Sequence, residues 1–379
     1  MTGGNVRPRS DEFYMERAIQ LATRGISNVF PNPRVGAVLV ANGEIVGEGF
    51  HRGYTEPHAE IAAIAAAGER ARGGTLYLNL EPCCHHGNTP PCTEAIIAAG
   101  IRKVVFGIID PDERVSGRGA QILRDNGIEV VVGVKAREAF RLNYPFIFRK
   151  KTGRSLIVLK IAVTLDGSMT LPGEGWFTSE ESRKYVHYLR AYHEAVAVGI
   201  GTVLSDDPAL DRRYFDRDLE PPVRMVFDSD LRFPPGSRWL SAGKKVIIYC
   251  GKGAGKEVAA RLREAGAGVN PIPEKQGRLD LGAWRDDISD RGITSVLVEG
   301  GAGISTSLLR RGLVDRLYIF TAPRISGVRG GSWFREEEEP ECIREGRMKL
   351  TEVTGSGQDI LAVYDSPVVR SHFASSGKE

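Results

Sequence analysis

A histidine and two cysteines near the amino end of the 379-residue chain are of the types that bind zinc. His58 begins a helix expected over 58–67, Cys83 follows a short strand, and Cys92 precedes a helix expected over 93–99. One imidazole and two thiolates can fill three corners of a tetrahedral zinc site, which leaves the fourth corner for water. Water bound in such an open site is a nucleophile at neutral pH. The spacing therefore predicts one catalytic zinc ion per chain.

Glu60 lies two residues beyond the histidine, so its carboxylate can face the same cavity without binding the metal. There it could transfer protons between water, a ring nitrogen and leaving ammonia. His-x-Glu followed by Pro-Cys and a second Cys is the pattern of zinc nucleobase deaminases. The alternative is a structural zinc, which normally has four protein ligands. The nearest fourth candidates, Cys84 and His85, directly adjoin Cys83, where joint ligation is sterically awkward, so a catalytic site is favoured.

A second group of residues in the later part of the chain indicates different chemistry. Lys160 lies inside an otherwise apolar strand, which is an unfavourable position for a charge unless it is paired or functional. Gly300 and Gly301 follow another strand and precede a helix, an arrangement that can offer backbone N–H groups to a pyrophosphate. By itself this pattern is more commonly a tight turn, and no Gly-x-Gly-x-x-Gly fingerprint is present. Arg190 and Arg213 have the side chain that binds phosphate through two hydrogen bonds.

Strand and helix signals alternate on both sides of a polar, basic stretch, which predicts two α/β domains. We place the first domain at 1–149, a linker at 150–154, the second domain at 155–368 and a flexible tail at 369–379. Asn42-Gly43 predicts a hairpin turn, and the acidic run at 336–339 predicts an exposed loop. The expected helices cover 11–23, 58–67, 93–99, 120–126, 180–192, 256–265 and 304–311, and the expected strands cover 35–40, 44–49, 75–80, 103–109, 130–134, 156–162, 195–198, 223–227, 246–249, 295–298 and 316–320.

Composition excludes several classes of protein. The chain has 51 basic and 48 acidic residues, and a net charge of +3 is too small to indicate a nucleic-acid partner or a polybasic membrane surface. No apolar run approaches the roughly 18–20 residues of a membrane helix, and residues 1–10 lack the apolar core of a secretory signal. Five cysteines do not make a disulfide framework, and we expect Cys250 and Cys342 to be buried thiols. A cytoplasmic enzyme with a small-molecule substrate is expected.

The surroundings of the zinc motif resemble one enzyme family. Eight residues separate Cys83 from Cys92 instead of the common two, and this insertion resembles the pyrimidine deaminase half of the bifunctional riboflavin-biosynthesis deaminase–reductases. The segments 32–36, 49–51, 57–60, 110–111 and 117–119 resemble it as well, whereas Thr55, Cys84 and Asn88 depart from the usual pattern. The resemblance implies a cytidine-deaminase-like three-layer domain. It also implies a pyrimidine pocket lined by Asn32, His51 and His86.

The second half of the chain resembles the reductase half of the same family. The similarity is carried by 159–167, 176–179, 199–210, 227–229 and 312–315. It implies a dihydrofolate-reductase-like α/β domain that uses NADPH, with Lys160, Asp206 and Glu299 around the sugar carbon that receives the hydride. The implied NADPH contacts are Ala162, Trp176, Thr202, Asp206, Ser229, Gly301, Ala302, Gly303, Ile304, Ser305, Thr306 and Ser307, and the implied substrate contacts are Glu174, which departs from the usual small polar residue, with Arg190, Leu210, Arg213 and Glu299.

Together these resemblances imply two successive steps of riboflavin synthesis. The first is hydrolytic deamination of 2,5-diamino-6-(5-phosphoribosylamino)pyrimidin-4(3H)-one, and the second is NADPH reduction of the ribosyl group of the product to ribityl. A homodimer or homotetramer is expected. One alternative is an RNA-base deaminase with an accessory binding domain, which predicts a basic face that the near-neutral charge does not favour. Another is a non-enzymatic protein with a structural zinc, which predicts loss of residues such as Glu60.

Overall fold

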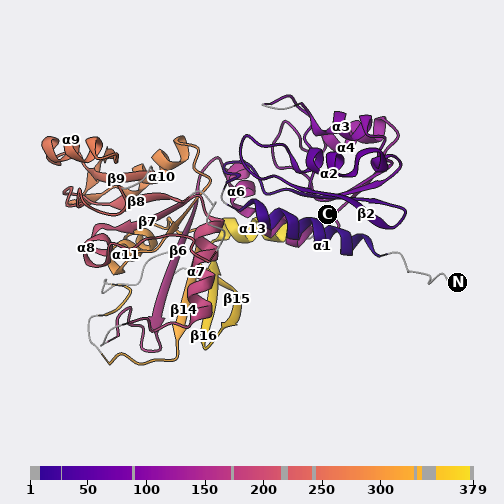
Figure 1. The fold of residues 1–379 in the computed structure, drawn as a ribbon. Coiled ribbons are helices and arrows are strands. Elements are labelled where there is room, and N and C mark those ends of the chain that lie inside the picture. Colours follow the sequence, from indigo (N-terminus) through magenta and orange to yellow (C-terminus); the bar gives the residue numbers. More distant parts are fainter. Residues whose placement is uncertain are drawn as a thin grey trace. The chain divides into compact units, whose positions relative to one another are not determined.

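A computed structural model of the chain describes residues 9–26, 28–87, 90–171, 175–214, 221–240, 245–327, 331–334 and 347–375. Its contacts divide the chain into two compact units, which are labelled by element in Figure 1. The first unit comprises residues 1–152 together with 373–379, and the second comprises residues 153–372. Each unit has its own central β-sheet and its own buried core.

The first unit is built on a five-stranded sheet of order β2-β1-β3-β4-β5. β1 is antiparallel to β2 and β3, while β3, β4 and β5 are parallel. Asn42 and Gly43 both have positive φ in the β1–β2 turn, as the Asn-Gly pair predicts. The elements are α1 (Asp11–Ala22), η1 (Thr23–Gly25), β1 (Gly36–Ala41), β2 (Glu44–Phe50), α2 (Ala59–Ala67), η2 (Gly68–Ala71), β3 (Thr75–Leu80), α3 (Cys92–Ala98), β4 (Lys103–Ile108), α4 (Arg118–Asp125), β5 (Glu129–Val132), α5 (Ala136–Leu142) and α6 (Tyr144–Thr152).

Helices cover both faces of this sheet, because alternate residues of its strands point to opposite sides and both sets are apolar. Leu39 packs into the core shared with α2, α3 and α4, whereas its neighbour Val38 packs into the core shared with α1. Gly49 of β2 allows α2 to lie directly on the sheet, since a Cβ there would be 2.4 Å from the carbonyl oxygen of Ala59. The predicted three-layer fold is confirmed (Figure 1).

Two segments that were predicted to be irregular are helical. The stretch predicted as a linker at 150–154 is helical as far as Thr152, and its basic residues form the last turn of α6, where cations interact favourably with the helix dipole. The segment predicted as a flexible tail at 369–379 lies largely within α13, which covers Pro367–Ser375. Phe373 belongs to the first unit, where its ring lies 4.8 Å from that of Tyr144. The acidic run at 336–339 lies outside the described residues.

The second unit is built on a nine-stranded sheet of order β10-β9-β8-β7-β13-β6-β14-β16-β15. The strands from β10 to β14 are parallel, and β16 and β15 complete one edge in antiparallel pairs. The predicted strands and helices are present with ends shifted by a few residues, whereas α8, α10, β10 and the β15–β16 hairpin were not predicted. The elements are β6 (Leu156–Thr164), α7 (Glu180–Tyr192), β7 (Ala195–Gly199), α8 (Ile200–Asp206), β8 (Val223–Phe227), β9 (Val246–Gly251), α9 (Lys256–Glu264), β10 (Gly268–Ile272), β11 (Glu274–Lys275), β12 (Arg278–Leu279), α10 (Leu281–Asp290), β13 (Ser295–Val298), α11 (Ala302–Arg310), β14 (Arg316–Ala322), β15 (Lys349–Ser356), β16 (Asp359–Asp365) and α13.

This topology determines where the predicted functional segments meet. Because β8, β7, β13 and β6 are adjacent and parallel, the segments that follow them emerge at the same edge of the sheet. Open α/β sheets bind ligands at this edge. The residues after β7, β8 and β13 include Thr202, Ser229 and Gly301, which the sequence predicts as cofactor contacts.

Candidate deaminase and reductase sites

The predicted zinc ligands lie together in the first unit. His58 is the N-cap of α2 and Cys92 is the first residue of α3, while Cys83 lies in the loop after β3. His58 Nδ1 is 3.2 Å from the sulfur of Cys92 and 3.5 Å from that of Cys83, and the three ligand atoms lie within 4.8 Å of one another. Neighbouring ligand atoms of a tetrahedral zinc site are separated by about 3.6–3.8 Å, given the usual Zn–N and Zn–S lengths. The three side chains therefore fit a zinc ion with one open coordination position.

The thiol of Cys83 is electrostatically prepared for a cation, whereas the hydrogen bond with Cys83 and burial raise the pKa of Cys92. The hydrogen bond with Cys92 lowers the pKa of Cys83, a change that burial opposes and His58 assists. The backbone N–H of Cys92, at the start of α3, donates to the Cys83 sulfur over 3.3 Å. A thiolate is the form of cysteine that binds metal. Cys84 is not part of this cluster, because its thiol donates instead to the carbonyl oxygen of Arg114 at 3.7 Å.

Glu60 is buried in the first turn of α2, beside the zinc ligands. Burial, and after it the charge of Cys83, raise the pKa of its carboxyl group to about 7. The carboxyl group interacts with the Cys92 thiol through a hydrogen bond. A carboxyl group that can gain or lose a proton near neutral pH is suited to general acid–base catalysis.

Asn32 and His51 lie next to this centre, as the sequence predicts. His51 is 3% exposed, and its ring centroid is 5.4 Å from that of His58. Its Nδ1 pairs with the carbonyl oxygen of Pro57 at 3.3 Å, so the proton resides there and Nε2 can accept from the Asn32 amide at 3.3 Å. Burial lowers the pKa of His51, which keeps the ring neutral. The pair therefore presents a fixed hydrogen-bonding edge beside the metal ligands.

His86 is placed differently from these two residues. Its side chain is 74% exposed and lies 3.5 Å from the carboxylate of Glu94. The structure thus brings Asn32 and His51 together and leaves His86 at the surface.

A cavity of about 520 Å³ adjoins His58 and is lined by Thr55, Pro57, His58, Ile61, Pro90, Pro91, Glu94, Ala95 and Ala98.

Glu81 was not predicted as a site residue, yet it supports the loop that carries Cys83. Its buried carboxylate accepts hydrogen bonds from the backbone N–H groups of Asp110, Gly117 and Ala120 at 2.9–3.1 Å. These bonds tie the segment before α4 and the first turn of α4 to the metal loop, and they connect the 110–111 and 117–119 motifs to the zinc motif. The position of Glu81 two residues before a predicted ligand was the only sequence signal available.

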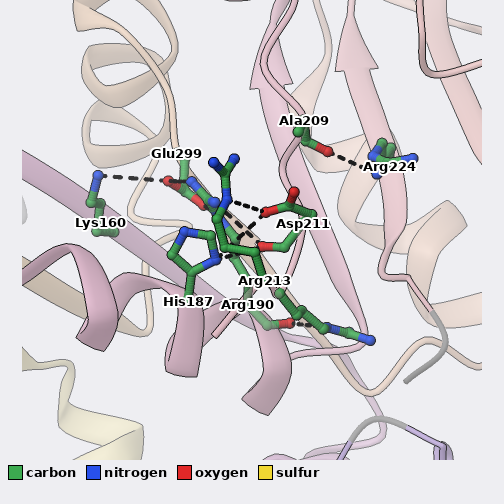
Figure 2. Close-up of polar contacts among 9 residues, drawn as sticks. Lys160, His187, Arg190, Ala209, Asp211, Arg213, Arg224 and Glu299 are labelled. Atoms are coloured by element: carbon green, nitrogen blue, oxygen red, sulfur yellow. Dashed lines mark hydrogen bonds and ion pairs between the residues drawn. The ribbon is translucent and has the colours of Figure 1, made fainter. Parts of the chain in front are cut away.

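In the second unit, three charged residues from separate elements converge (Figure 2). Glu299 directly follows β13, and its carboxylate accepts from Arg190 of α7 at 2.5 and 3.0 Å. Lys160 of β6 lies 3.6 Å from the same carboxylate. The side chains of Glu299 and Arg190 are 8% and 13% exposed. Sequence reasoning selected all three residues but did not predict the Arg190–Glu299 ion pair.

The charges of this cluster depend on one another. Burial alone would raise the pKa of Glu299, but Arg190 and Lys160 lower it to about 2. Burial lowers the pKa of Lys160, and the carboxylate of Glu299 opposes this change. Glu299 is therefore ionised at neutral pH, and it stabilises a buried ammonium group that can donate a hydrogen bond.

The two predicted phosphate-binding arginines differ in their surroundings. Arg190 uses Nε and one terminal nitrogen for Glu299, and its other terminal nitrogen lies 3.4 Å from the carbonyl oxygen of Asp211. Arg213 is 61% exposed and pairs with the carboxylate of Asp211 at 3.0 Å. Arg190 is thus engaged inside the site, whereas Arg213 lies at the surface, where a phosphate can reach it. Asp206 is exposed at the end of α8 and takes no part in the Lys160–Glu299–Arg190 cluster.

The start of α11 fits a pyrophosphate group. Gly301 is the N-cap of this nine-residue helix and provides no side chain to satisfy the first N–H groups. A Cβ at Gly301 or Gly303 would meet no atom within 4 Å, so the space beside these two residues is open. Helix N-termini of this kind bind phosphate groups. Of the other predicted cofactor contacts, Ile304, Ser305, Thr306 and Ser307 lie in α11, Ala302 is its first residue, Ala162 lies in β6, Thr202 in α8, Ser229 after β8, and Trp176 is 81% exposed.

Leu210 is 4% exposed in the segment between α8 and β8. Glu174 and Cys342 lie outside the described residues, and Cys250 is buried as expected. No helix in the described part of the chain is long and apolar enough to cross a membrane.

Comparison with known proteins accounts for both sites. Residues 8–108 match the cytidine and deoxycytidylate deaminase zinc-binding region, and residues 155–362 match the RibD C-terminal domain. The riboflavin biosynthesis protein RibD of Escherichia coli is 41% identical over 330 residues, which cover 84% of this chain and 89% of that protein. The RibD protein of Aquifex aeolicus is 42% identical, with 93% and 98% of the two chains covered.

Solved structures agree over nearly the whole chain. Acinetobacter baumannii RibD has a TM-score of 0.81 at 35% identity, with 94% of this chain and 98% of that chain covered. A Thermotoga maritima diaminohydroxyphosphoribosylaminopyrimidine deaminase/5-amino-6-(5-phosphoribosylamino)uracil reductase has a TM-score of 0.78 at 33% identity, with the same coverage. The chain belongs to the RibD family of bifunctional riboflavin-biosynthesis enzymes, in which a zinc-dependent deaminase and an NADPH-dependent reductase share one polypeptide.

Proposed function

We propose that His58, Cys83 and Cys92 hold the zinc ion of the deaminase and that Glu60 is its proton carrier. The bound metal supplies an activated water at neutral pH. Glu60 takes up a proton near the zinc ligands and returns it to the pyrimidine ring or to the departing amine. Its burial supports this role, because a pKa near 7 permits both transfers. The observation that carries the assignment is the convergence of the three ligand atoms beside this buried carboxyl group.

Asn32 and His51 are proposed to bind the pyrimidine of 2,5-diamino-6-(5-phosphoribosylamino)pyrimidin-4(3H)-one. The Pro57 carbonyl oxygen fixes the tautomer of His51, so the Asn32–His51 pair meets the base with a defined hydrogen-bonding pattern. His86 is proposed to contact the same substrate from the surface, where it pairs with Glu94. We assign the deaminase to residues 1–149 and the reductase to residues 155–368.

For the reductase, we propose that Lys160 and Glu299 lie against the ribosyl group of the deaminated product. NADPH supplies the hydride when it is bound at the α11 end of the sheet. Lys160 holds a proton close to the sugar, and Glu299 keeps that ammonium group charged and in place. Arg190 orients Glu299, and Arg213 is placed to bind the phosphate of the substrate together with the neighbouring Leu210. The other NADPH and substrate contacts that the family resemblance implies, Asp206 and Glu174 among them, are part of the same proposal.

Two further properties follow from the family relationship and the chemistry of the site. A zinc site with two thiolates is maintained in a reducing compartment, so we propose that the enzyme works in the cytoplasm. We also propose that it forms a homodimer or homotetramer. Sedimentation equilibrium of the purified chain measures the oligomeric state directly.

The proposed function is tested by feeding the diaminopyrimidine substrate to the purified chain. Elemental analysis should give about one zinc per chain. Ammonia release should precede NADPH oxidation, because the reductase acts on the deaminated product. NADPH consumption without prior ammonia release, or zinc without either activity, would contradict the assignment.

A further inference from the structure

The segment that joins α8 to the rest of the reductase site has an unusual backbone. Asp207 and Leu210 both have positive φ, of 34° and 42°, although neither is glycine. A branched residue such as Leu210 rarely adopts this conformation, which persists only where surrounding contacts enforce it. Such strain is concentrated at ligand-binding and active sites. The contacts that hold residues 207–213, here called the substrate turn, therefore indicate how the site is prepared.

The first part of the substrate turn is anchored by the 237–239 segment. The carboxylate of Asp207 accepts from the Ser237 hydroxyl at 2.7 Å and from the backbone N–H of Arg238 at 3.3 Å. The indole N–H of Trp239 donates to the carbonyl oxygen of Pro208 at 2.6 Å. Trp239 is fully buried, so this bond is made away from solvent. These bonds fix the backbone on one side of Leu210.

Arg224 of β8 fixes the centre of the turn (Figure 2). It is 1% exposed, and it donates from one terminal nitrogen to the carbonyl oxygen of Ala209 at 2.8 Å. Its guanidinium carbon lies 5.7 Å from the centroid of the Trp239 ring. Nε and the second terminal nitrogen have no hydrogen-bond partner, and the residue forms no ion pair with a carboxylate, within the part of the chain that the structure describes. A buried arginine held in this way is unfavourable for stability, which points to a function beyond stabilising the fold.

The last part of the substrate turn connects directly to the Lys160–Glu299–Arg190 cluster. The carbonyl oxygen of Asp211 accepts from His187 Nδ1 at 2.9 Å and lies 3.4 Å from Arg190. Its carboxylate holds Arg213 at 3.0 Å. A shift of Ala209 would therefore move Asp211, and with it the arginine that is placed to bind phosphate.

We propose that Arg224 is a positioning residue of the reductase, which holds the substrate turn in the conformation that binds the phosphorylated substrate. It acts through Ala209 and does not touch the reacting atoms. The inference rests on the proposed reductase function. It adds a role for a residue that neither the motifs nor the phosphate chemistry had selected.

The test compares steady-state reduction of 5-amino-6-(5-phosphoribosylamino)uracil by the full-length chain and by R224M and R224K. We expect R224M to raise KM for the uracil at least about tenfold, while KM for NADPH changes less than twofold and deamination is unaltered. R224K keeps a donor and the charge and should recover part of the loss. R263M is a surface control, because Arg263 also donates to a carbonyl oxygen, that of Val269 at 3.2 Å, but is exposed and lies outside the turn.

The outcomes separate the inference from the function on which it rests. Failure of the parent chain to reduce the uracil would overturn the proposed function. A parent chain that is active, with an unchanged uracil KM in R224M, would overturn the inference alone, and so would equal increases of KM for NADPH and the uracil. If R224M does not fold, W239F decides, because phenylalanine keeps an aromatic ring beside Arg224 but is smaller than the indole and cannot donate to Pro208. W239F should raise the uracil KM, and an unchanged value would refute the proposal.

Discussion

Replacing Glu299 by glutamine should destabilise the second unit selectively. Glutamine retains the shape of the side chain but removes the negative charge that pairs with Arg190 and Lys160. Two buried cations would then face each other without a counter-charge. Removing one partner of a buried ion pair typically costs about 3–5 kcal/mol.

The pKa of Glu299 gives an independent value for the stability that its charge contributes. Its folded value of about 2 lies below the ordinary value of 4.5, because the two cations outweigh the effect of burial. A depression of this size corresponds to about 3 kcal/mol of stability. Since the folded pKa is the lower one, this stabilisation is fully present above about pH 5 and is lost as the pH falls through 4.5 toward 2. The difference between the parent chain and E299Q should therefore be largest near neutrality and should shrink in acid.

Urea unfolding followed by tryptophan fluorescence measures the difference in stability between the second unit of the parent chain and that of E299Q. All four tryptophans lie between residues 153 and 372, so the signal reports the second unit alone. With a slope of about 2 kcal/mol per M, the midpoint of E299Q should fall by about 1.5 M at pH 7. E180Q is the matched control, because Glu180 pairs with Lys184 at 2.8 Å on an exposed face and should leave the midpoint unchanged. Equal midpoints for E299Q and the parent chain at pH 7 would refute the electrostatic reasoning.

Four further substitutions test the chemistry. E60Q should keep zinc and the fold but lose at least about 10²-fold in deaminase rate, because it cannot transfer a proton; ammonia release at the parent rate would exclude the role. C83S should lose most of the zinc, whereas C84S should retain it, since the Cys84 thiol points to a carbonyl oxygen; elemental analysis distinguishes them, and equal zinc contents would contradict the ligand set. K160A should abolish NADPH oxidation and leave ammonia release intact; loss of both activities would indicate misfolding instead.

The zinc ligands could be predicted because their signals are local. His58 and Cys92 each lie at a helix start that proline and alanine patterns mark in the sequence. Cys83 follows a strand whose limits the sequence predicts. Glu81 shows the limit of this reasoning. Its three partners lie 29 to 39 residues later, in a loop and in the first turn of α4, and their backbone amides carry no sequence signal.

The helical structure of the two segments that were predicted to be irregular has a physical cause. Polar basic residues suggested a linker near 150, but cations are favourable at the carboxyl end of a helix, and those residues end α6. The tail was expected to fray because terminal residues seldom make contacts. Phe373 instead packs against the rings of Phe140 and Tyr144, and only the folded chain brings them together.

The Lys160–Glu299–Arg190 cluster shows that predicted strands do not by themselves give the order of strands in the sheet. Lys160 was selected because a charge inside an apolar strand requires a partner, but the partner depends on the order of strands in the sheet. Val298 at the end of β13 pairs in register with Leu159 of β6, so Glu299 follows at the level of Lys160. The same order places α7 so that Arg190 reaches that carboxylate. Arg190, which the phosphate chemistry of arginine had assigned to the substrate, is thereby the counter-ion of the Glu299 carboxylate.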